Sequence, residues 1–276
     1  MFNLYNLYDG VILFTQHLMK NEEIAMKLGA QLYSIRDYCQ DAEGLRKAFR
    51  LVKEIGYEAV QISGISPTIT AAEIAACVKE FDLPVPLTHS DPNRIIGDTD
   101  ALIAEHKLYG ATEIGIGGLG RVPDVETARA KFDALREATK KINAAGMTFA
   151  FHNHYWEYHD IGGTTMYDLM VNEYPEFNFI QDVCWTAYAG FDPAKIIHDL
   201  RGRIINIHFK DHTTLTPEGK ICPCGEGLVN MQAVYDACVA TGVQNVFVEQ
   251  DNAPDSGDSI GQMAISYKNL APIFGK

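Results

Sequence analysis

Short apolar runs alternate with amphipathic stretches along most of this 276-residue chain, and this alternation limits the possible folds more than any other feature of the sequence. The strand-like runs are Leu28–Tyr33, Ala59–Ile62, Val85–His89, Glu113–Gly117, Thr148–His154, Phe177–Asp182, Ile204–Lys210 and Val246–Glu249. The stretches with helical spacing are Ala42–Ile55, Thr70–Phe81, Thr99–Leu108, Val125–Ala144, Thr165–Glu173, Pro193–Leu200, Val229–Ala240 and Ser259–Phe274. Strands separated by crossover helices pair in parallel. Eight such units in about 250 residues predict a single-domain α/β protein with a (β/α)₈ barrel, the TIM barrel.

A doubly wound open sheet is the competing arrangement, because it is also built from alternating strands and helices. From residue 26 onward the chain shows no linker and no break in composition, so we expect residues 26–276 to form one catalytic barrel domain. The first 25 residues do not fit this pattern. Asp9 and Gly10 interrupt their apolar start, which is not the order of a signal peptide, and Met26 opens the first strand-like run. We expect residues 1–25 to be a loosely ordered extension or an artefact of the assigned start site.

The charge and the cysteines narrow the class of protein. A formal net charge of −13 opposes binding to phosphate backbones, so we expect no nucleic-acid partner. No apolar run approaches the ~20 residues that a membrane helix needs, and we expect no membrane partner. The six cysteines are scattered, which indicates reduced thiols in a cytoplasmic protein. Cys222 and Cys224 are one residue apart without a second pair, so they predict a loop rather than a thiolate site.

Groups that can bind a metal end four consecutive strand-like runs. They are His152 and His154 in the fifth run, Asp182 in the sixth, His208 in the seventh and Glu249 in the eighth, while His89 ends the third and Lys210 follows His208 on the same strand face. Each alone would be an ordinary turn or surface group. TIM-barrel active sites lie where the strands end, however, so these side chains are expected to meet there. Imidazoles with carboxylates suit Mn²⁺, Co²⁺, Fe²⁺ or Zn²⁺ better than Ca²⁺.

One glycine-rich segment matches a nucleotide-binding pattern without its context. Residues 115–120, Gly-Ile-Gly-Gly-Leu-Gly, follow a strand-like run. In a dinucleotide site the helix begins within the glycines, but here residues 121–124 intervene before the helical stretch. The segment therefore predicts a loop whose backbone approaches a substrate.

At these residues the chain resembles the sugar phosphate isomerase/epimerase family, the xylose isomerase-like TIM barrels. The resemblance spans about residues 26–274 and rests on short pieces in a fixed order: His152-Asn153-His154, Asp182 with Trp185 and residues 190–193, residues 208–211, residues 225–227 and Glu249. Members include ketose 3-epimerases, hydroxypyruvate isomerases, inosose dehydratases and apurinic endonucleases. The resemblance implies a metal-binding enzyme of carbohydrate metabolism.

The resemblance also implies the ligands of that metal. Carried over by position, they are His152, Asp182, His208 and Glu249. Much of the family has glutamate at the place of His152, and in its epimerases that glutamate is one of two acid–base groups, so this chain departs from the two-glutamate pattern. His154 is the alternative ligand from the same run. We expect one divalent metal ion, Mn²⁺ first, with Co²⁺, Fe²⁺, Zn²⁺ or Mg²⁺ as alternatives.

We expect a metal-dependent isomerase or epimerase that acts on a small sugar or keto-sugar through an enediolate. Glu249 would take the proton, and His152 or His154 would serve the other face. Lys210 would stabilise the developing oxyanion, unless it forms a salt bridge with Asp211. His89, Trp185, His154 and Lys210 would contact the sugar.

Three alternatives stay open at this point. The first is a dehydratase or lyase that acts by β-elimination on a keto-sugar or inosose. The others are an apurinic endonuclease-like repair enzyme, which the acidic charge disfavours, and a barrel that binds a sugar without catalysis. Assembly into a homo-oligomer is also left open.

Overall fold

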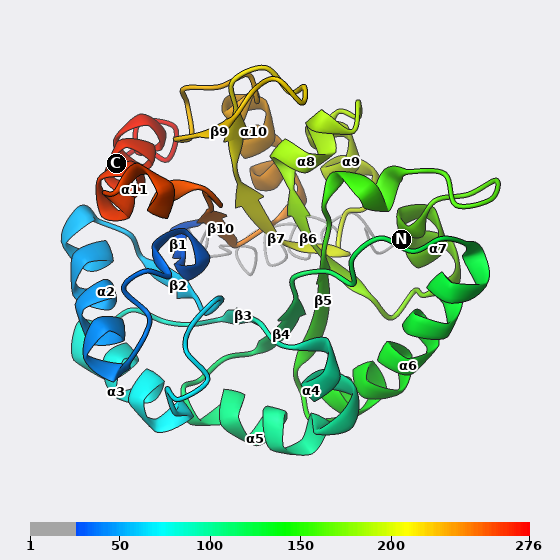
Figure 1. Ribbon diagram of the computed structural model, residues 1–276, viewed down its shortest axis with the longest axis horizontal. Coiled ribbons are helices and arrows are strands. Elements are labelled where there is room, and N and C mark those ends of the chain that lie inside the picture. Colours follow the sequence, from blue (N-terminus) through cyan, green and yellow to red (C-terminus); the bar gives the residue numbers. More distant parts are fainter. Residues whose placement is uncertain (1–25) are drawn as a thin grey trace, which may run out of the picture.

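A computed structural model describes residues 26–276, and the expectation for residues 1–25 lies outside this described part. Eight parallel strands form the sheet: β1 (Lys27–Gln31), β2 (Ala59–Gln61), β3 (Leu87–His89), β4 (Glu113–Ile116), β5 (Thr148–His152), β6 (Asn178–Asp182), β7 (Ile204–Phe209) and β10 (Asn245–Val248). They pair in the order β2-β1-β10-β7-β6-β5-β4-β3. A parallel bridge between Ile62 and Thr88 joins β2 to β3 and closes the ring seen in Figure 1. The predicted TIM barrel is confirmed.

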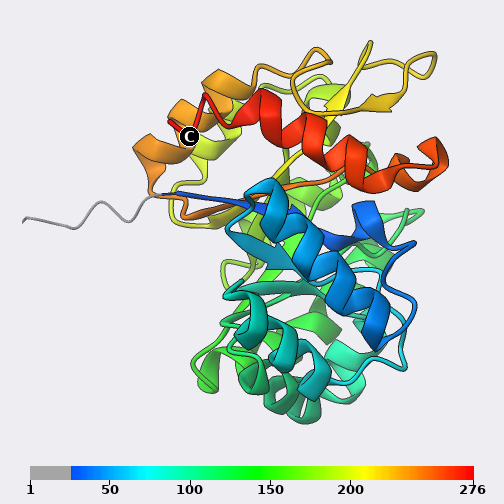
Figure 2. The ribbon, with the colours of Figure 1, turned by 90° about the vertical axis from the view of Figure 1, so that its left-hand side faces the viewer.

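The helices cover the outside of this barrel. They are α2 (Ala42–Ile55), α3 (Ala71–Phe81), α4 (Pro92–Gly97), α5 (Thr99–Leu108), α6 (Val125–Ala144), α7 (Met166–Glu173), α8 (Val183–Tyr188), α9 (Pro193–Asp199), α10 (Met231–Thr241) and α11 (Ser259–Leu270). Figure 2 shows α11 lying beside α2, so the last helix packs against the first. In the described chain no helix is long and apolar enough to cross a bilayer.

Helix α2 shows how local sequence signals set these elements. Asp41 caps its first turn by accepting a hydrogen bond from Gly44 N, and Gly56 ends it with φ of 118°, a conformation that favours glycine. Leu45, Phe49 and Val52 lie fully buried on one face. This apolar stripe faces the sheet, and the helix bounds match the prediction.

The expected runs extended two residues beyond the carboxyl ends of two strands. The fifth run was expected to reach His154, but β5 ends at His152 because Glu157 accepts a hydrogen bond from His154 N and a 3₁₀ turn, η3 (Tyr155–Tyr158), begins there. Likewise, β1 gives way to η2 (Leu32–Ile35) where Gln31 caps Tyr33 N. Helices α4 and α8 and the hairpin β8 (Asp211–His212) with β9 (Ile221–Cys222) were not predicted, since each is short.

The inside of the barrel is layered, and the layers place the site. Ala59, Leu87, Ala150, Ile180 and Phe247 form a separate buried apolar cluster from five different strands. Successive residues of a strand point to opposite faces, so the residue two positions later also points inward, nearer the carboxyl end. Those residues are Gln61, His89, His152, Asp182 and Glu249. The apolar layer is therefore the floor on which a polar layer rests.

Candidate metal centre and active site

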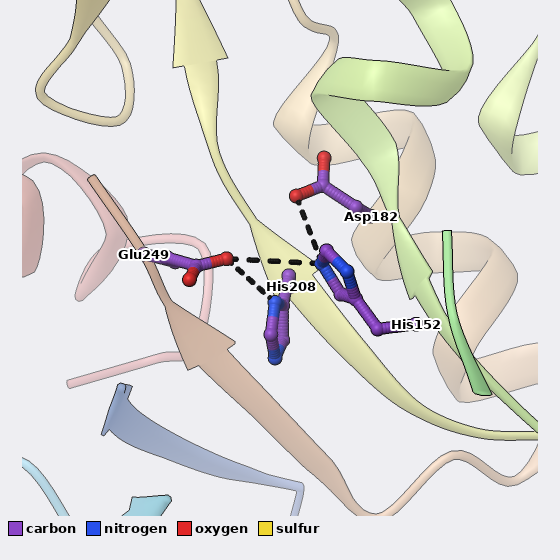
Figure 3. A group of neighbouring side chains, drawn as sticks. All are labelled: His152, Asp182, His208 and Glu249. Atoms are coloured by element: carbon purple, nitrogen blue, oxygen red, sulfur yellow. Dashed lines mark hydrogen bonds and ion pairs between the residues drawn. The ribbon is translucent and has the colours of Figure 1, made fainter. Parts of the chain in front are cut away.

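Four side chains meet in the polar layer where β5, β6, β7 and β10 end. His152, Asp182, His208 and Glu249 each offer one ligand atom, and these atoms all lie within 4.8 Å of one another. All four residues are buried. Figure 3 shows their side chains pointing toward a common centre from separate strands. The structure thus brings together the four residues that the resemblance implied as ligands.

The distances within this metal-ligand group are short. His208 Nδ1 lies 2.8 Å from Glu249 Oε2. His152 Nε2 lies 3.4 Å from Asp182 Oδ2 and 3.8 Å from Glu249 Oε2 (Figure 3). One imidazole nitrogen and one carboxylate oxygen of each pair therefore face each other around one point.

Asp182 is fixed in orientation by its neighbours. It is the N-cap of α8, and its Oδ1 accepts a hydrogen bond from Trp185 N at 2.9 Å. Its own backbone N–H donates to Asn153 Oδ1 at 2.9 Å. With Oδ1 used by the helix, Oδ2 remains for the centre of the group.

Two glutamines of the opposite half of the rim hold the ligands, and the sequence analysis missed both. Gln61 Oε1 accepts a hydrogen bond from His208 Nε2 at 2.6 Å, which leaves His208 Nδ1 free to act as a ligand. Gln31 Nε2 donates to Glu249 Oε1 at 3.3 Å. Both are the last residues of their strands, β1 and β2, with inward-facing small residues two positions earlier. That alternation is the signal that would have found them.

Lys210 makes contacts that correct one expectation. Its Nζ lies 3.0 Å from Asp182 Oδ2, 3.1 Å from Glu249 Oε2 and 3.1 Å from Asp251 Oδ1, so its partners are these three carboxylates and not Asp211. Burial lowers the pKa of Lys210, but the three carboxylates raise it by more than burial lowers it. The resulting pKa is well above the usual value of a lysine. Lys210 is therefore a buried ammonium ion.

Asp211 instead organises the loop after β9. Its carboxylate accepts hydrogen bonds from the backbone N–H groups of Gly225, Gly227 and Val229 at 2.9–3.0 Å. Glu226, in the same Gly-Glu-Gly loop, is exposed and does not line the cavity described below. This piece of the resemblance is structural in the present fold.

The donor set fits a divalent metal. Within residues 26–276, the buried Nε2 of His152 has no hydrogen-bond partner, and the buried Oδ2 of Asp182 has no hydrogen bond besides its ion pair with Lys210. Burial, followed by the neighbouring His208, lowers the pKa of His152 well below its usual value, so the imidazole is neutral as a ligand must be. Burial raises the pKa of Glu249, but Lys210 and His208 lower it by more than burial raises it. The resulting pKa is well below the usual value, so the carboxyl group is ionised. Two imidazoles and two carboxylates are ligands that Zn²⁺ and Mn²⁺ accept.

A cavity of about 540 Å³ opens above the metal-ligand group. His152 and Glu249 form part of its lining together with the expected sugar-contacting residues His89, His154, Trp185 and Lys210. Residues that the sequence analysis missed, among them Tyr33, Ser63, Trp156 and Asp251, complete it. Its volume falls in the range of small-molecule sites.

The structure separates the two histidines of the fifth run. His152 belongs to the metal-ligand group, whereas His154 lines the cavity and stacks on Trp156, with ring centroids 4.0 Å apart. Burial, then the neighbouring His152, lowers the pKa of His154 to about 2. The strand ends between the two residues, which places His154 above the layer of the ligands.

The glycine-rich segment after β4 is a cavity wall. Gly117 and Gly118 line the cavity, and a Cβ atom on them would lie 3.1 Å from the rings of His89 and His154, respectively. The backbone approaches the cavity as expected, and helix α6 starts only at Val125. In the described chain Cys222, the last residue of β9, and Cys224 are free thiols.

Comparisons with known proteins find the same fold among solved structures. No protein-family model matches the chain, and no curated protein matches it in sequence. Among solved structures, a sugar phosphate isomerase/epimerase from Parabacteroides distasonis is 21% identical with a TM-score of 0.76, covering 90% of this chain and 99% of that one. The IOLI protein with a bound zinc atom is 16% identical with a TM-score of 0.72, covering 91% and 98%.

A third structure is described as the probable 3-DHS dehydratase AsbF from Bacillus anthracis. It is 14% identical with a TM-score of 0.65, covering 87% of this chain and 98% of that one. At these identities the likeness concerns the fold. The chain has the TIM-barrel fold of structures named sugar phosphate isomerase/epimerase and xylose isomerase domain protein. The family resemblance noted in the sequence is therefore confirmed for the fold.

Proposed function

We propose that this protein is a metal-dependent isomerase or epimerase that removes a proton next to the carbonyl group of a small sugar or keto-sugar. The observation that carries the proposal is the buried group of His152, Asp182, His208 and Glu249 at the base of the cavity. The names of the structural neighbours support the same substrate class.

The four ligands would hold one divalent ion. When bound, it would act as a Lewis acid toward a carbonyl oxygen and a neighbouring hydroxyl of the substrate. Mn²⁺ is the first choice and Zn²⁺ the second, because the IOLI neighbour carries zinc. Lys210 adds a fixed positive charge, held by Asp182, Glu249 and Asp251, next to the place where negative charge develops.

Two groups of the cavity can move protons. Glu249 is ionised and lines the cavity, so its carboxylate can accept the proton from the substrate carbon. His154 reaches the same cavity from beyond β5, which β6 and β7 separate from β10 in the sheet. Its imidazole is neutral, so it would pass a proton from that other side by accepting it at one ring nitrogen while donating from the other. The enediolate would then be reprotonated at the same or the neighbouring carbon.

A lyase that acts by β-elimination is the second candidate, and one observation favours it. The fifth strand supplies the imidazole of His152 and no carboxylate, so the group lacks a second carboxylate opposite Glu249. Epimerisation needs comparable acid–base groups on both faces of the carbon. Elimination needs one base, a role that Glu249 would fill, and the proton that Glu249 takes from the carbon would then pass to the leaving group. The dehydratase neighbour is consistent with it.

Elemental analysis of the purified protein tests the shared step. We expect about one Mn, Zn, Co or Fe per chain in the wild type and loss of the metal in Asp182→Ala and His208→Ala. Asp192→Ala is the matched control, because Asp192 caps α9 as Asp182 caps α8 but lies outside the metal-ligand group. A wild type that neither carries nor binds any of these metals would contradict the proposal.

The reaction type is then read in deuterated water. Deuterium incorporated into recovered substrate or product keto-sugar supports isomerisation or epimerisation, whereas an unsaturated product supports elimination. Metal binding without exchange or product, across a panel of keto-sugars, would support a sugar-binding barrel without catalysis.

A further inference from the structure

The side chains that line the cavity indicate the charge of the molecule that binds in it. Among the described residues, the lining contains one cationic side chain, Lys210, and three carboxylates, Glu249, Asp251 and Asp91. Asp182 lies just beneath, 3.0 Å from Lys210 Nζ. The cavity is therefore acidic before any metal binds.

The positive charges of the site are already balanced. Lys210 is shared by Asp182, Glu249 and Asp251, all within 3.1 Å. One ammonium and one divalent ion together balance these three carboxylates. Asp91 adds a further negative charge at the cavity wall. A phosphate or carboxylate on the substrate would thus meet no uncommitted cation.

The short helices that begin at the cavity do not offer an anion site either. Asp91 caps α4, where Pro92 also removes one backbone N–H, and Asp182 caps α8. Each aspartate places its own carboxylate at the helix start and accepts a backbone N–H there. The positions that in other proteins attract a phosphate are therefore already occupied by negative charge.

Two arginines lie near the cavity without lining it. Arg36 donates hydrogen bonds to the backbone oxygens of Tyr33 and Asp251 at 2.7 and 3.0 Å. Arg121 is exposed and donates to the Tyr155 hydroxyl at 2.7 Å. Arg36 is committed to holding the rim, whereas Arg121 is an exposed cation that a phosphate extending out of the cavity could reach.

The remaining wall suits an uncharged ring with hydroxyl groups. Trp156 and Trp185 line the cavity, and His154 stacks on Trp156 with 12° between the ring planes. Aromatic faces accept the apolar C–H faces of a sugar ring. Within the described part of the chain, the buried Nε1 of Trp185 and Nε2 of His89 lack hydrogen-bond partners. Substrate hydroxyl groups would supply them.

We infer that the cavity takes an uncharged sugar, without phosphate or carboxylate, and that its acidic wall rejects the phosphorylated form. The inference rests on the proposed function and adds the charge of its substrate. It predicts a difference between two molecules with the same carbon skeleton, which makes it testable before the natural sugar is known.

Tryptophan fluorescence measures this difference directly, because the sequence has two tryptophans and both line the cavity. Metal-loaded protein, freed of excess metal, is titrated with matched pairs: D-fructose against its 1- and 6-phosphates, D-ribulose against its 5-phosphate, and D-glucose against D-glucuronate and glucose 6-phosphate. We expect saturable changes with free sugars, at least tenfold weaker binding of each charged partner, and no response to inorganic phosphate.

Two variants show whether the acidic wall causes the preference. Asp91→Asn keeps a good N-cap and removes one charge, and Asp251→Asn frees part of the charge of Lys210. Each is expected to reduce the preference for the free sugar at least threefold. Arg121→Gln should leave the preference unchanged. If a phosphate ester binds through Arg121 in the wild type, this variant abolishes that binding.

The outcomes separate the inference from the proposed function. A phosphate ester that binds as tightly as its free sugar, or tighter, overturns the inference. The proposed function still stands if that ester incorporates deuterium from the solvent. Free sugars that bind selectively without exchange support the inference and contradict the proposed function. Failure of every sugar, free or charged, to bind the metal-loaded protein overturns both.

Discussion

The two halves of the barrel rim do different work. In the half formed by β5, β6, β7 and β10, every strand ends in an ionisable group that points into the site, and these groups make up the metal-ligand group (Figures 1 and 3). In the half formed by β1 to β4, the corresponding positions are Gln31, Gln61, His89 and Gly117. The first half thus carries charge, and the second is neutral.

The neutral half orients the charged half. Gln61 fixes the ring of His208 from across the barrel, and Gln31 contacts Glu249 from the neighbouring strand, each through one hydrogen bond. His89 packs against His152 and His208 with ring centroids 5.0 and 5.2 Å apart. Neutral partners can hold ligands in place without competing for the metal. The comparison predicts large losses from changes in the charged half and graded losses from the neutral half.

Glu249→Gln should give the largest effect. The amide keeps the shape of the side chain but removes a ligand charge and the base, so proton exchange should fall by at least about 10³-fold. Deuterium incorporation and metal content measure it. Glu226→Gln is the control, because Glu226 is exposed outside the cavity. Retained exchange in Glu249→Gln would assign the base to another group.

His106 tests whether an imidazole of the neutral half is structural. It is buried under β3, with Nε2 2.7 Å from Thr88 Oγ1 and Nδ1 2.8 Å from Leu102 O, and burial lowers its pKa to about 4. In the unfolded chain the imidazole of His106 takes up a proton at a higher pH, near its usual pKa of ~6.5. The contribution of neutral His106 to the unfolding free energy is therefore complete above pH ~6.5 and is lost as the pH falls toward 4.

The expected loss between pH 7 and pH 4 is up to about 3 kcal/mol of unfolding free energy. It is measured by urea unfolding of the wild type and His106→Gln at both pH values, because the variant should lack this part of the pH dependence. His198→Gln, an exposed position on α9, is the control. An unchanged pH dependence in His106→Gln would show that His106 is protonated in the fold.

Gln61→Leu should weaken metal binding by about 10- to 100-fold, because His208 loses the acceptor that fixes its ring and its tautomer. Calorimetric titration of the metal-free protein with Mn²⁺ or Zn²⁺ measures the affinity. Gln232→Leu, on the exposed face of α10, is the matched control. Wild-type affinity in Gln61→Leu would mean that the neutral half does not orient the ligands, and the comparison would fail.

The sequence predicted the charged half better than the neutral half, for a physical reason. A histidine or carboxylate at a strand end is an unusual group in a buried place, so these positions were candidates once the barrel was expected. The family resemblance then implied His152, Asp182, His208 and Glu249 as the ligands. A glutamine gives no such signal. The role of Gln61 depends on its distance to His208, 147 residues away, and only the closed barrel sets that distance.

The partners of Lys210 were missed for the same reason. Asp211 is adjacent in sequence, but successive strand residues point to opposite faces, and Asp211 turns outward to bind its loop. Asp251 follows the last strand and reaches Lys210 across the rim. Helix bounds such as Ala42–Ile55 were predictable because caps and apolar spacing are local, whereas ion pairs across a barrel are not.

Gly118→Ala should give the smallest effect and sharpen the comparison at the wall of the neutral half. Gly118 has φ of 130°, and a Cβ atom there would lie 3.1 Å from the His154 ring. Strain at this φ should cost about 1 kcal/mol of unfolding free energy. The added methyl group should also shift His154 and weaken sugar binding a few-fold, seen by tryptophan fluorescence.

Gly120→Ala is the control, because its φ is 70° with no atom within 4 Å of the added Cβ, so it should lose stability alone. Equal sugar binding in both variants would show that the close approach of this loop to His154 has no part in recognition.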